Sequence, residues 1–308
     1  MNAVELRGLS KSYGRRPALR AIDLTLAGNQ IVGVVGPDGA GKTTLIRTLA
    51  GLLVIEAVEA MVLGYDLHDD VTDLKVEVGY VPQAFSLQRE LSVIENLKFT
   101  ARLHRLAPAV FDERGRDLLA RTGLTPFVDR PAGALSGGMK QKLAVINALL
   151  PQPRLILLDE PTAGVDVTSR AEIWAMLQSS SSNALVVIST SYLDEAEACD
   201  RLVYLEAGRI VAEGAPADLR ARVPLELYRV WNDDPRRLAR AVRRLPYVEG
   251  ARQTGTCTRI EVSRDQSPGF DRVRSDLRAI GDPPVHLVEQ LPIDMEAMLL
   301  HLSRGDES

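Results

Sequence analysis

Residues 36–44 (GPDGAGKTT) carry the clearest chemical pattern in the chain, a glycine-rich loop of the form G-x-x-x-x-G-K-[ST]. An apolar, β-branched run (30–36) precedes it and apolar residues at helical spacing follow it (43–53), so the loop joins a buried strand to a helix. Glycines let backbone N–H groups turn toward a polyanion, and the helix N-terminus adds partial positive charge. A chance match in a glycine-rich turn is the alternative, but the flanking segments favour a nucleoside triphosphate site. The residues of this predicted phosphate loop are Gly36, Pro37, Asp38, Gly39, Ala40, Gly41, Lys42, Thr43 and Thr44.

Reactive side chains come from this loop and from the end of a second apolar run. Lys42 is expected to reach the β- and γ-phosphates, and the hydroxyl of Thr43 to hold Mg²⁺. The run RLILLDE (154–160) is typical of a central parallel strand and ends in two carboxylates. Because ligands of such sheets lie beyond the carboxyl ends of the strands, Asp159 is expected in the Mg²⁺ shell. Glu160 is expected to orient or deprotonate a water.

Four other positions are less specific. Tyr13 could stack on a purine base, although packing within its own turn is the simpler interpretation. Gln83 directly follows a predicted strand (76–82) and could bind Mg²⁺ or water, yet most such glutamines are solvated loop residues. Asp166 is expected to cap a helix that ends near residue 178, before a polar turn at 179–183.

The fourth is the segment LSGGMKQK (135–142), which precedes an apolar helix. Ser136 can cap that helix, while Gly137 and Gly138 let another group approach its first turn. The segment is therefore either a capped helix after a loop or a second anion-binding helix N-terminus.

Composition limits the function classes. The chain has 308 residues, 45% hydrophobic and 25% charged, as in a globular protein of one large or two modest domains. A net charge of −4 argues against a broad nucleic-acid-binding face. Two cysteines without metal spacing favour a reducing cytoplasm. The sequence predicts neither a secretory signal nor a membrane span, so a membrane role is expected to come through a partner.

The order of the predicted elements divides the chain in two. Residues 1–222 alternate strands and helices in an α/β phosphate-loop core, with a helical insertion at about 84–150. Residues 223–308 follow a β-α-β-β-α-β order with a final helix, which is typical of a small α+β ferredoxin-like domain. This second part carries no phosphate loop, acid cluster or metal cluster, and its sequence indicates no function.

With these elements in order, residues 3–222 resemble the ATP-binding subunit of an ABC transporter. LSGGMKQK is similar to the signature motif of that family, which kinases and GTPases of the phosphate-loop class do not carry. The resemblance implies an ABC-type core, a mixed sheet with a helical insertion, that binds ATP and Mg²⁺. It also implies that two subunits face each other, each ATP lying between one phosphate loop and the partner's signature helix.

The resemblance also implies roles for the less specific positions. Tyr13 becomes the adenine-stacking residue, and Gln83 links Mg²⁺ to the transmembrane partner. Asp159 matches the aspartate of the Mg²⁺ shell, and Glu160 matches the catalytic glutamate. The residues implied to act on the partner's nucleotide are Ser136, Gly137, Gly138 and Asp166.

Two positions depart from the family pattern. Where the family places a histidine that contacts the γ-phosphate, this chain has Ser191, which puts hydrolysis at its own phosphate loop in doubt. A capping box between Ser191 and Asp194 is expected to preserve the local helix. The run STSYLDEAE (189–197) resembles the first nucleotide-binding half of tandem drug-exporter ATPases, where one half lacks this histidine. In the family a polar turn usually follows the first helix, whereas this chain has VIEAV at residues 54–58. This change has no functional explanation.

The expected function is an ATP-hydrolysing subunit that powers a separate permease, an exporter of drugs or other hydrophobic compounds, with a hydrolytic site weakened at Ser191. Residues 223–308 resemble the accessory domain found after many ABC-2 type exporter ATPases. The chain is expected on the inner face of the cell membrane, held there by the permease and paired with an identical or different ATPase subunit. Neither nucleic acid nor direct membrane insertion is expected. The alternatives are a largely non-hydrolysing regulatory ATP binder and a soluble ABC ATPase outside transport.

Overall fold

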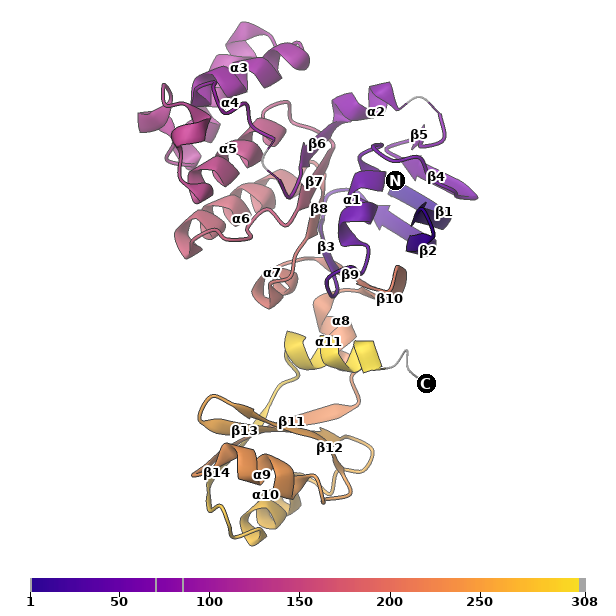
Figure 1. Cartoon of the computed structure of the whole chain (residues 1–308), viewed down its shortest axis with the longest axis vertical. Coiled ribbons are helices and arrows are strands. Elements are labelled where there is room, and N and C mark those ends of the chain that lie inside the picture. The colour runs from indigo at the N-terminus through magenta and orange to yellow at the C-terminus, as the bar shows by residue number, and fades with distance from the viewer. Residues whose placement is uncertain (1, 70, 85, 305–308) are drawn as a thin grey trace. The chain divides into compact units, whose positions relative to one another are not determined.

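The computed structural model describes residues 2–69, 71–84 and 86–304 (Figure 1). The chain divides into two compact units, Met1–Pro216 and Ala217–Ser308, each with its own hydrophobic core. The sequence-based boundary at residue 222 falls a few residues later, just after helix α8 (Pro216–Ala221).

A six-stranded sheet of order β10-β9-β3-β8-β7-β6 forms the centre of the first unit. Its strands run parallel except β10, which pairs antiparallel with β9. Every residue of β3, β7 and β8 is buried because both sheet faces are covered, which explains their continuous apolar sequences. The strands are β3 (Ile31–Val35), β6 (Val78–Val81), β7 (Leu155–Asp159), β8 (Leu185–Ser189), β9 (Arg201–Glu206) and β10 (Arg209–Gly214).

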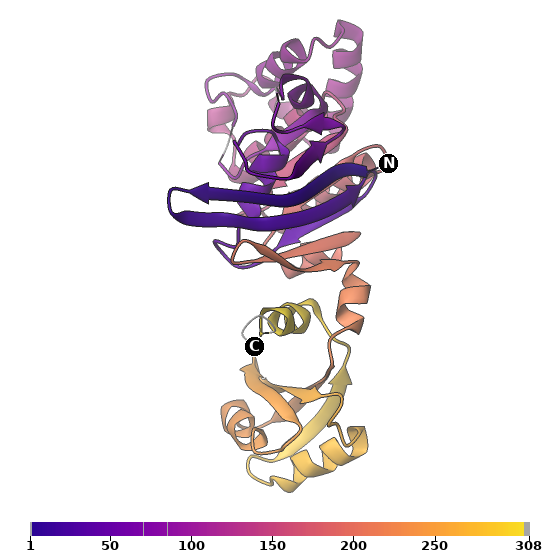
Figure 2. The ribbon, with the colours of Figure 1, turned by 90° about the vertical axis from the view of Figure 1, so that its right-hand side faces the viewer.

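A second, antiparallel sheet of order β2-β1-β4-β5 belongs to the same core. Helix α1 (Lys42–Leu49) lies between the two sheets, and its Leu45, Ile46 and Leu49 are fully buried against both (Figure 1). The long β1–β2 hairpin, indigo in Figure 2, ends at Tyr13. The strands are β1 (Asn2–Tyr13), β2 (Arg16–Ala27), β4 (Glu59–Val62) and β5 (Tyr65–Asp66).

Helices form the remainder of the first unit and include the predicted helical insertion. Within it, Ser92 and Glu95 make a capping box at the start of α3. Two sequence expectations are wrong here. Residues 72–77 form a helix, so the strand predicted at 76–82 begins only at Val78. The predicted turn at 179–183 is helical as far as Ser181. The helices are α2 (Thr72–Glu77), α3 (Val93–Leu103), α4 (Pro108–Arg121), α5 (Gly137–Leu149), α6 (Val167–Ser181) and α7 (Leu193–Glu197), with 3-10 turns at Thr125–Phe127 and Ala132–Ala134.

The second unit has the predicted ferredoxin-like arrangement, an antiparallel sheet of order β12-β13-β11-β14. Helices α9 and α10 cover one face, where Tyr228, Val230 and Ile260 centre the core, and α11 lies over the other (Figures 1 and 2). The elements are β11 (Leu225–Asn232), α9 (Pro235–Val242), β12 (Val248–Thr254), β13 (Cys257–Ser263), α10 (Phe270–Ala279), β14 (Val285–Leu291) and α11 (Met295–Arg304).

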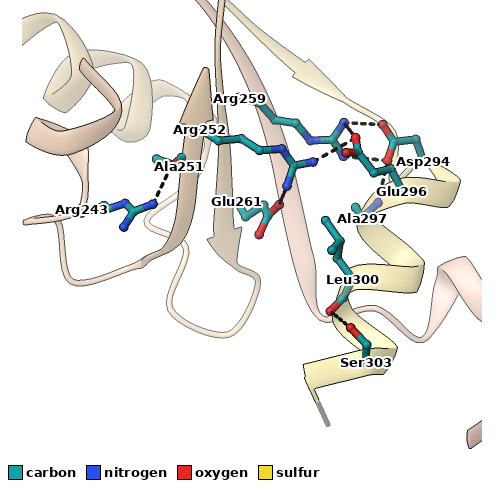
Figure 3. A network of polar contacts seen from close by, with 10 residues as sticks. All are labelled: Arg243, Ala251, Arg252, Arg259, Glu261, Asp294, Glu296, Ala297, Leu300 and Ser303. Atoms are coloured by element: carbon teal, nitrogen blue, oxygen red, sulfur yellow. Dashed lines mark hydrogen bonds and ion pairs between the residues drawn. The ribbon is translucent and has the colours of Figure 1, made fainter. Parts of the chain in front are cut away.

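Charged side chains tie α11 to its face of the sheet (Figure 3). The guanidinium of Arg259, a side chain only 9% exposed, donates to both carboxylate oxygens of Asp294 at 2.6 Å. Arg252 pairs with Glu261 at 3.2 Å and with Glu296 at 2.9 Å. Burial alone would raise the pKa of Asp294, but its bonds from Arg259 and from the amide of Ala297 lower that pKa below its ordinary value.

Candidate nucleotide site

The phosphate loop has a backbone that only glycine can adopt at two points. Gly36 has φ of +150°, and a Cβ there would lie 2.0 Å from the carbonyl oxygen of Leu205. Gly41 has φ of +110°, and its Cβ would lie 2.5 Å from the carbonyl oxygen of Ala18. The loop therefore packs tightly against its neighbours on both sides, which fixes its curvature before any ligand arrives.

Lys42 is held within this loop at the start of α1. Its ammonium donates to the carbonyl oxygens of Gly36 at 2.8 Å and Pro37 at 3.1 Å, and the residue is only 6% exposed. The positive charge thus lies at the loop together with the α1 N-terminus. Both features suit a phosphate group, as the sequence pattern predicts.

Asp159 lies at the carboxyl end of β7 and is fully buried. Its Oδ1 accepts hydrogen bonds from Thr43 Oγ1 at 3.0 Å and from Ser189 Oγ at 2.7 Å. Its Oδ2 has no hydrogen-bond partner among the described residues. A buried carboxylate oxygen without a donor is costly, and together with the hydroxyl of Thr43 it makes an oxygen pair that fits Mg²⁺.

Glu160 adopts a backbone conformation that is rare for a residue with a side chain. Its φ is +50°, and its amide donates to the Ser189 carbonyl at 3.2 Å and to Ser189 Oγ at 3.0 Å. Its carboxylate accepts from Gln83 Nε2 at 3.0 Å, across 77 positions of sequence. Backbone strain of this kind concentrates at functional sites. The structure thus brings together Gln83, Thr43, Asp159 and Glu160.

A second group of predicted residues lies where helices α5 and α6 begin. Ser136 caps α5 by accepting from the amide of Met139, and Asp166 caps α6 by accepting from that of Ser169, so both predicted caps are confirmed. The bond from Ser169 lowers the pKa of Asp166. A Cβ on Gly138 would lie 3.0 Å from Asp166 Oδ2, so the two helix starts are adjacent. Ser136, Gly137 and Asp166 are exposed there.

Tyr13 and Ser191 are both exposed, and the local structure after Ser191 differs from the sequence prediction. Tyr13 is 49% exposed at the hairpin end, with the ammonium of Lys11 5.6 Å from its ring centre. Ser191 follows β8, but the expected capping box with Asp194 does not form. Helix α7 begins after Tyr192 without a side-chain cap, and the carboxylate of Asp194 accepts from Arg170 Nη1 at 3.4 Å instead.

Ser189 was not predicted as a site residue, although it bonds both Asp159 and Glu160. A serine that ends an apolar strand, beside a strand ending in two acids, is the signal that could have found it. Glu195, buried between Thr162 and Thr190, was not predicted either. No sequence signal marks Glu195, because its partners come from separate segments.

Across residues 2–69, 71–84 and 86–304, no helix combines the length and the apolar character needed to span a bilayer.

Known proteins are similar to this chain over most of its length. The family profile described as ABC transporter matches residues 19–163. The chain is 36% identical over 294 residues to the probable multidrug ABC transporter ATP-binding protein YbhF of Escherichia coli K12, covering 94% of this chain and 50% of that protein. It thus spans half the length of this relative. It is 33% identical to the Nod factor export ATP-binding protein I of Rhizobium sp. strain N33 over 308 residues, covering 98% of this chain and 97% of that protein.

Solved structures agree with this assignment. The ATP-binding subunit of an ABC transporter superposes with a TM-score of 0.67 at 29% identity, over 71% of this chain and 92% of that chain. The dimeric cassette MJ0796 bound to ADP and Pi gives a TM-score of 0.64 at 25% identity, over 69% of this chain and 98% of that chain. By its phosphate loop, its signature segment and these relatives, the chain belongs to the family of ABC transporter ATP-binding proteins.

Proposed function

We propose that the chain binds and hydrolyses ATP to drive a separate membrane permease in export. The observation that carries the proposal is the hydrogen bond from Thr43 to Asp159, which directly precedes Glu160 and has its second carboxylate oxygen buried without a donor among the described residues. The name of one relative, the Nod factor export ATP-binding protein I, supports export as the direction. We place the chain on the inner face of the cell membrane, through that permease.

The site residues divide the chemistry among them. The phosphate-loop amides and Lys42 would hold the β- and γ-phosphates and offset their charge. Mg²⁺ bound by Thr43 and Asp159 would supply further positive charge at those phosphates. Glu160 would take the proton of the water that attacks the γ-phosphorus, while the bond to ADP breaks and inorganic phosphate leaves. Gln83 would orient Glu160 through its 3.0 Å hydrogen bond.

Ser191 is the reason to propose an asymmetric pair of ATPase subunits. Its exposed hydroxyl stands where the family resemblance expects a histidine against the γ-phosphate. Losing such a contact to the transferring group costs about 2–4 kcal/mol, or roughly 30- to 1000-fold in rate. A different partner ATPase with that histidine would form the faster site, to which this chain lends Ser136, Gly137, Gly138 and Asp166. Tyr13 would stack on the adenine of this chain's own ATP.

The permease would dock beside the helical insertion. A groove of about 200 Å³ lies between β6 and α3, and its lining includes Tyr80, Phe99 and Asn147. Phe99 is 45% exposed, the neighbouring Leu103 is also exposed, and Asn147 Oδ1 is buried without a partner among the described residues. Exposed apolar side chains around a polar hollow suit a partner helix with a polar residue at its centre.

Two measurements test this function. Calorimetry with MgATP should detect binding by the purified chain and lose it in Lys42→Ala, because the loop loses its side-chain countercharge. Lys75→Ala removes an exposed lysine of α2 and is the matched control. ATP hydrolysis is then measured with the permease and the partner ATPase present. Equal nucleotide affinity in wild type and Lys42→Ala would refute the site, and tight binding without turnover in the full complex would favour the regulatory ATP binder.

A further inference from the structure

Glu195 on helix α7 is a buried carboxylate that the proposed nucleotide chemistry does not use. The residue is 2% exposed. Its Oε1 accepts from Thr162 Oγ1 and its Oε2 from Thr190 Oγ1, each at 2.5 Å. Nε of Arg170 lies 3.7 Å from Oε1. Each carboxylate oxygen therefore has its own short hydrogen bond, and a cation offsets the charge.

The partners of Glu195 belong to the segments that flank the reactive positions. Thr162 lies two residues after Glu160, in the loop that leads to Asp166. Thr190 immediately precedes Ser191 and also accepts from the amide of Tyr192. One carboxylate thus joins the chain just beyond Glu160 to the chain just before Ser191.

Arg170 extends this connection to helix α6. Its guanidinium lies over the Tyr192 ring, 4.0 Å from the ring centre, and pairs with Asp194 at 3.4 Å. Asp166 caps the same helix, at the surface proposed to meet the second ATPase. The network around Glu195 therefore spans the Glu160 segment, the Ser191 segment and the helix that begins at that surface.

Physical chemistry indicates that these contacts fix positions firmly. A buried carboxylate is tolerated only when its oxygens are bonded, and O–H···O⁻ bonds are short and strong. Helix α7 has only five residues and no side-chain cap, so the need to anchor α7 would explain one hydrogen bond to Glu195. Anchoring α7 would not require two hydroxyls from the loops on either side of the reactive residues.

We propose that Glu195 is a positioning residue for ATP hydrolysis, which holds the Ser191 segment in register with Glu160 and with the loop leading to Asp166. The turnover part of this inference rests on the proposed function, whereas the mechanical link between the two loops does not. Nucleotide binding through Lys42 and Thr43 lies outside the network, so ATP affinity should be independent of Glu195.

Four variants of the full chain separate positioning from simple stability. Glu195→Ala removes both acceptors, and Thr162→Val removes one hydroxyl at nearly constant shape. Glu195→Gln keeps an oxygen and an amide that can bond both hydroxyls, so it should restore most of the function. Glu197→Gln makes the same chemical change at an exposed position of α7 and is the matched control.

With the partner ATPase and permease present, turnover should come mainly from the faster site of the partner, on which this chain acts through Asp166. By releasing the loop that leads to Asp166, Glu195→Ala should lower kcat about 10- to 100-fold, the range for lost hydrogen bonds to a charged group. The Kd for MgATP should change less than about two-fold, and Glu195→Gln should recover kcat to within about three-fold. Hydrogen exchange of the free chain supplies a second readout. In Thr162→Val, amides in residues 190–195 should exchange about 10-fold faster although the substitution lies some thirty residues away in sequence.

The outcomes distinguish this inference from the proposed function. If the wild-type complex hydrolyses ATP and Glu195→Ala does so equally fast, the positioning role is wrong and the function stands. A matching loss of kcat and ATP affinity, not restored by glutamine, would make Glu195 a purely structural residue. If the wild-type complex does not hydrolyse ATP, the proposed function fails, and the hydrogen-exchange experiment alone tests the link between the two loops. Unchanged exchange in residues 190–195 of Thr162→Val would then overturn the link.

Discussion

The hydroxyl of Thr43 donates to Oδ1 of Asp159 across 3.0 Å, although 116 positions of sequence separate the two residues. Strands β3 and β7, which lead to them, are not neighbours, because β8 lies between them in the sheet. β8 contributes Ser189, whose hydroxyl donates to the same oxygen at 2.7 Å. The site is therefore assembled at the carboxyl ends of three adjacent parallel strands, where ligands of such sheets bind. Both donors share Oδ1, so Oδ2 has no donor among the described residues and is the oxygen that the proposed Mg²⁺ would bind.

Asp159→Asn should separate Mg²⁺ dependence from ATP binding itself. Asparagine keeps an oxygen for Thr43 and Ser189 but removes the charge that Mg²⁺ needs. Affinity for ATP with excess Mg²⁺ should fall about 10- to 100-fold, and affinity in EDTA should change little. Calorimetry in both buffers measures this, with Asp117→Asn at an exposed position of α4 as control. An equal loss with and without Mg²⁺ would mean that Asp159 supports the fold and not the metal.

Ser191→His should accelerate hydrolysis by this chain alone. The proposed missing contact is worth about 2–4 kcal/mol, so kcat should rise roughly 30- to 1000-fold if the imidazole reaches the γ-phosphate. Steady-state phosphate release from the purified chain, beside a Ser191→Asn variant that adds bulk without an imidazole, gives the comparison. Fast hydrolysis by the wild type, unchanged in Ser191→His, would remove the reason to propose a second kind of ATPase subunit.

Much of this site was predictable because its pattern is local. The phosphate loop, the paired acids and the capped signature helix each occupy one short segment, and each lies at the end of an apolar strand or the start of a helix. The ferredoxin-like order of the second unit was predictable for the same reason, since its strand and helix periods alternate cleanly. In such cases the residues that form the element also carry the sequence pattern that predicts it.

Features that depend on tertiary partners were not predictable. Ser189 and Glu195 acquire their roles from hydrogen bonds across 30 or more positions of sequence. Asp194, expected to close a capping box with Ser191, pairs instead with Arg170 of α6, 24 positions away in sequence. Residues 179–181, predicted as part of a polar turn, continue α6 instead, and the Ser180 hydroxyl bonds back to the carbonyl of Met176 in the same helix.

Phe99→Asp should weaken attachment to the permease without changing ATP binding. Phe99 lines the groove between β6 and α3, and a carboxylate there would have to be desolvated under an apolar partner surface. Co-sedimentation with membranes that contain the permease should fall about 10-fold or more. The control is Val58→Asp, an 86% exposed apolar position of the same unit outside that groove. Equal losses in both variants would place the contact elsewhere.

Arg259→Met should destabilise the second unit at neutral pH. Methionine keeps most of the length of the side chain but leaves Asp294 without its two hydrogen bonds of 2.6 Å. Loss of bonds between charged groups costs about 1.5–3 kcal/mol, and the lower end applies because Asp294 is 43% exposed. Urea unfolding followed by Trp231 fluorescence, in a Trp174→Phe background, reports this unit. Arg272→Met, which removes an exposed arginine that pairs with Asp276 on α10, is the matched control.

Acid should abolish the difference between wild type and Arg259→Met, and the sign follows from the direction of the shift. Burial raises the pKa of Asp294, but the bonds from Arg259 and Ala297 outweigh it, so the folded-state pKa lies below the ordinary 3.8. A lowered carboxylate pKa contributes stability that is fully present above the unfolded-state value and is lost as the pH falls through the folded-state value. The difference in the free energy of unfolding should therefore stay constant from neutral pH down to just above 3.8 and shrink on further acidification. A difference that grows in acid, or that never exceeds the one for Arg272→Met, would mean that Asp294 does not depend on Arg259 for its charge.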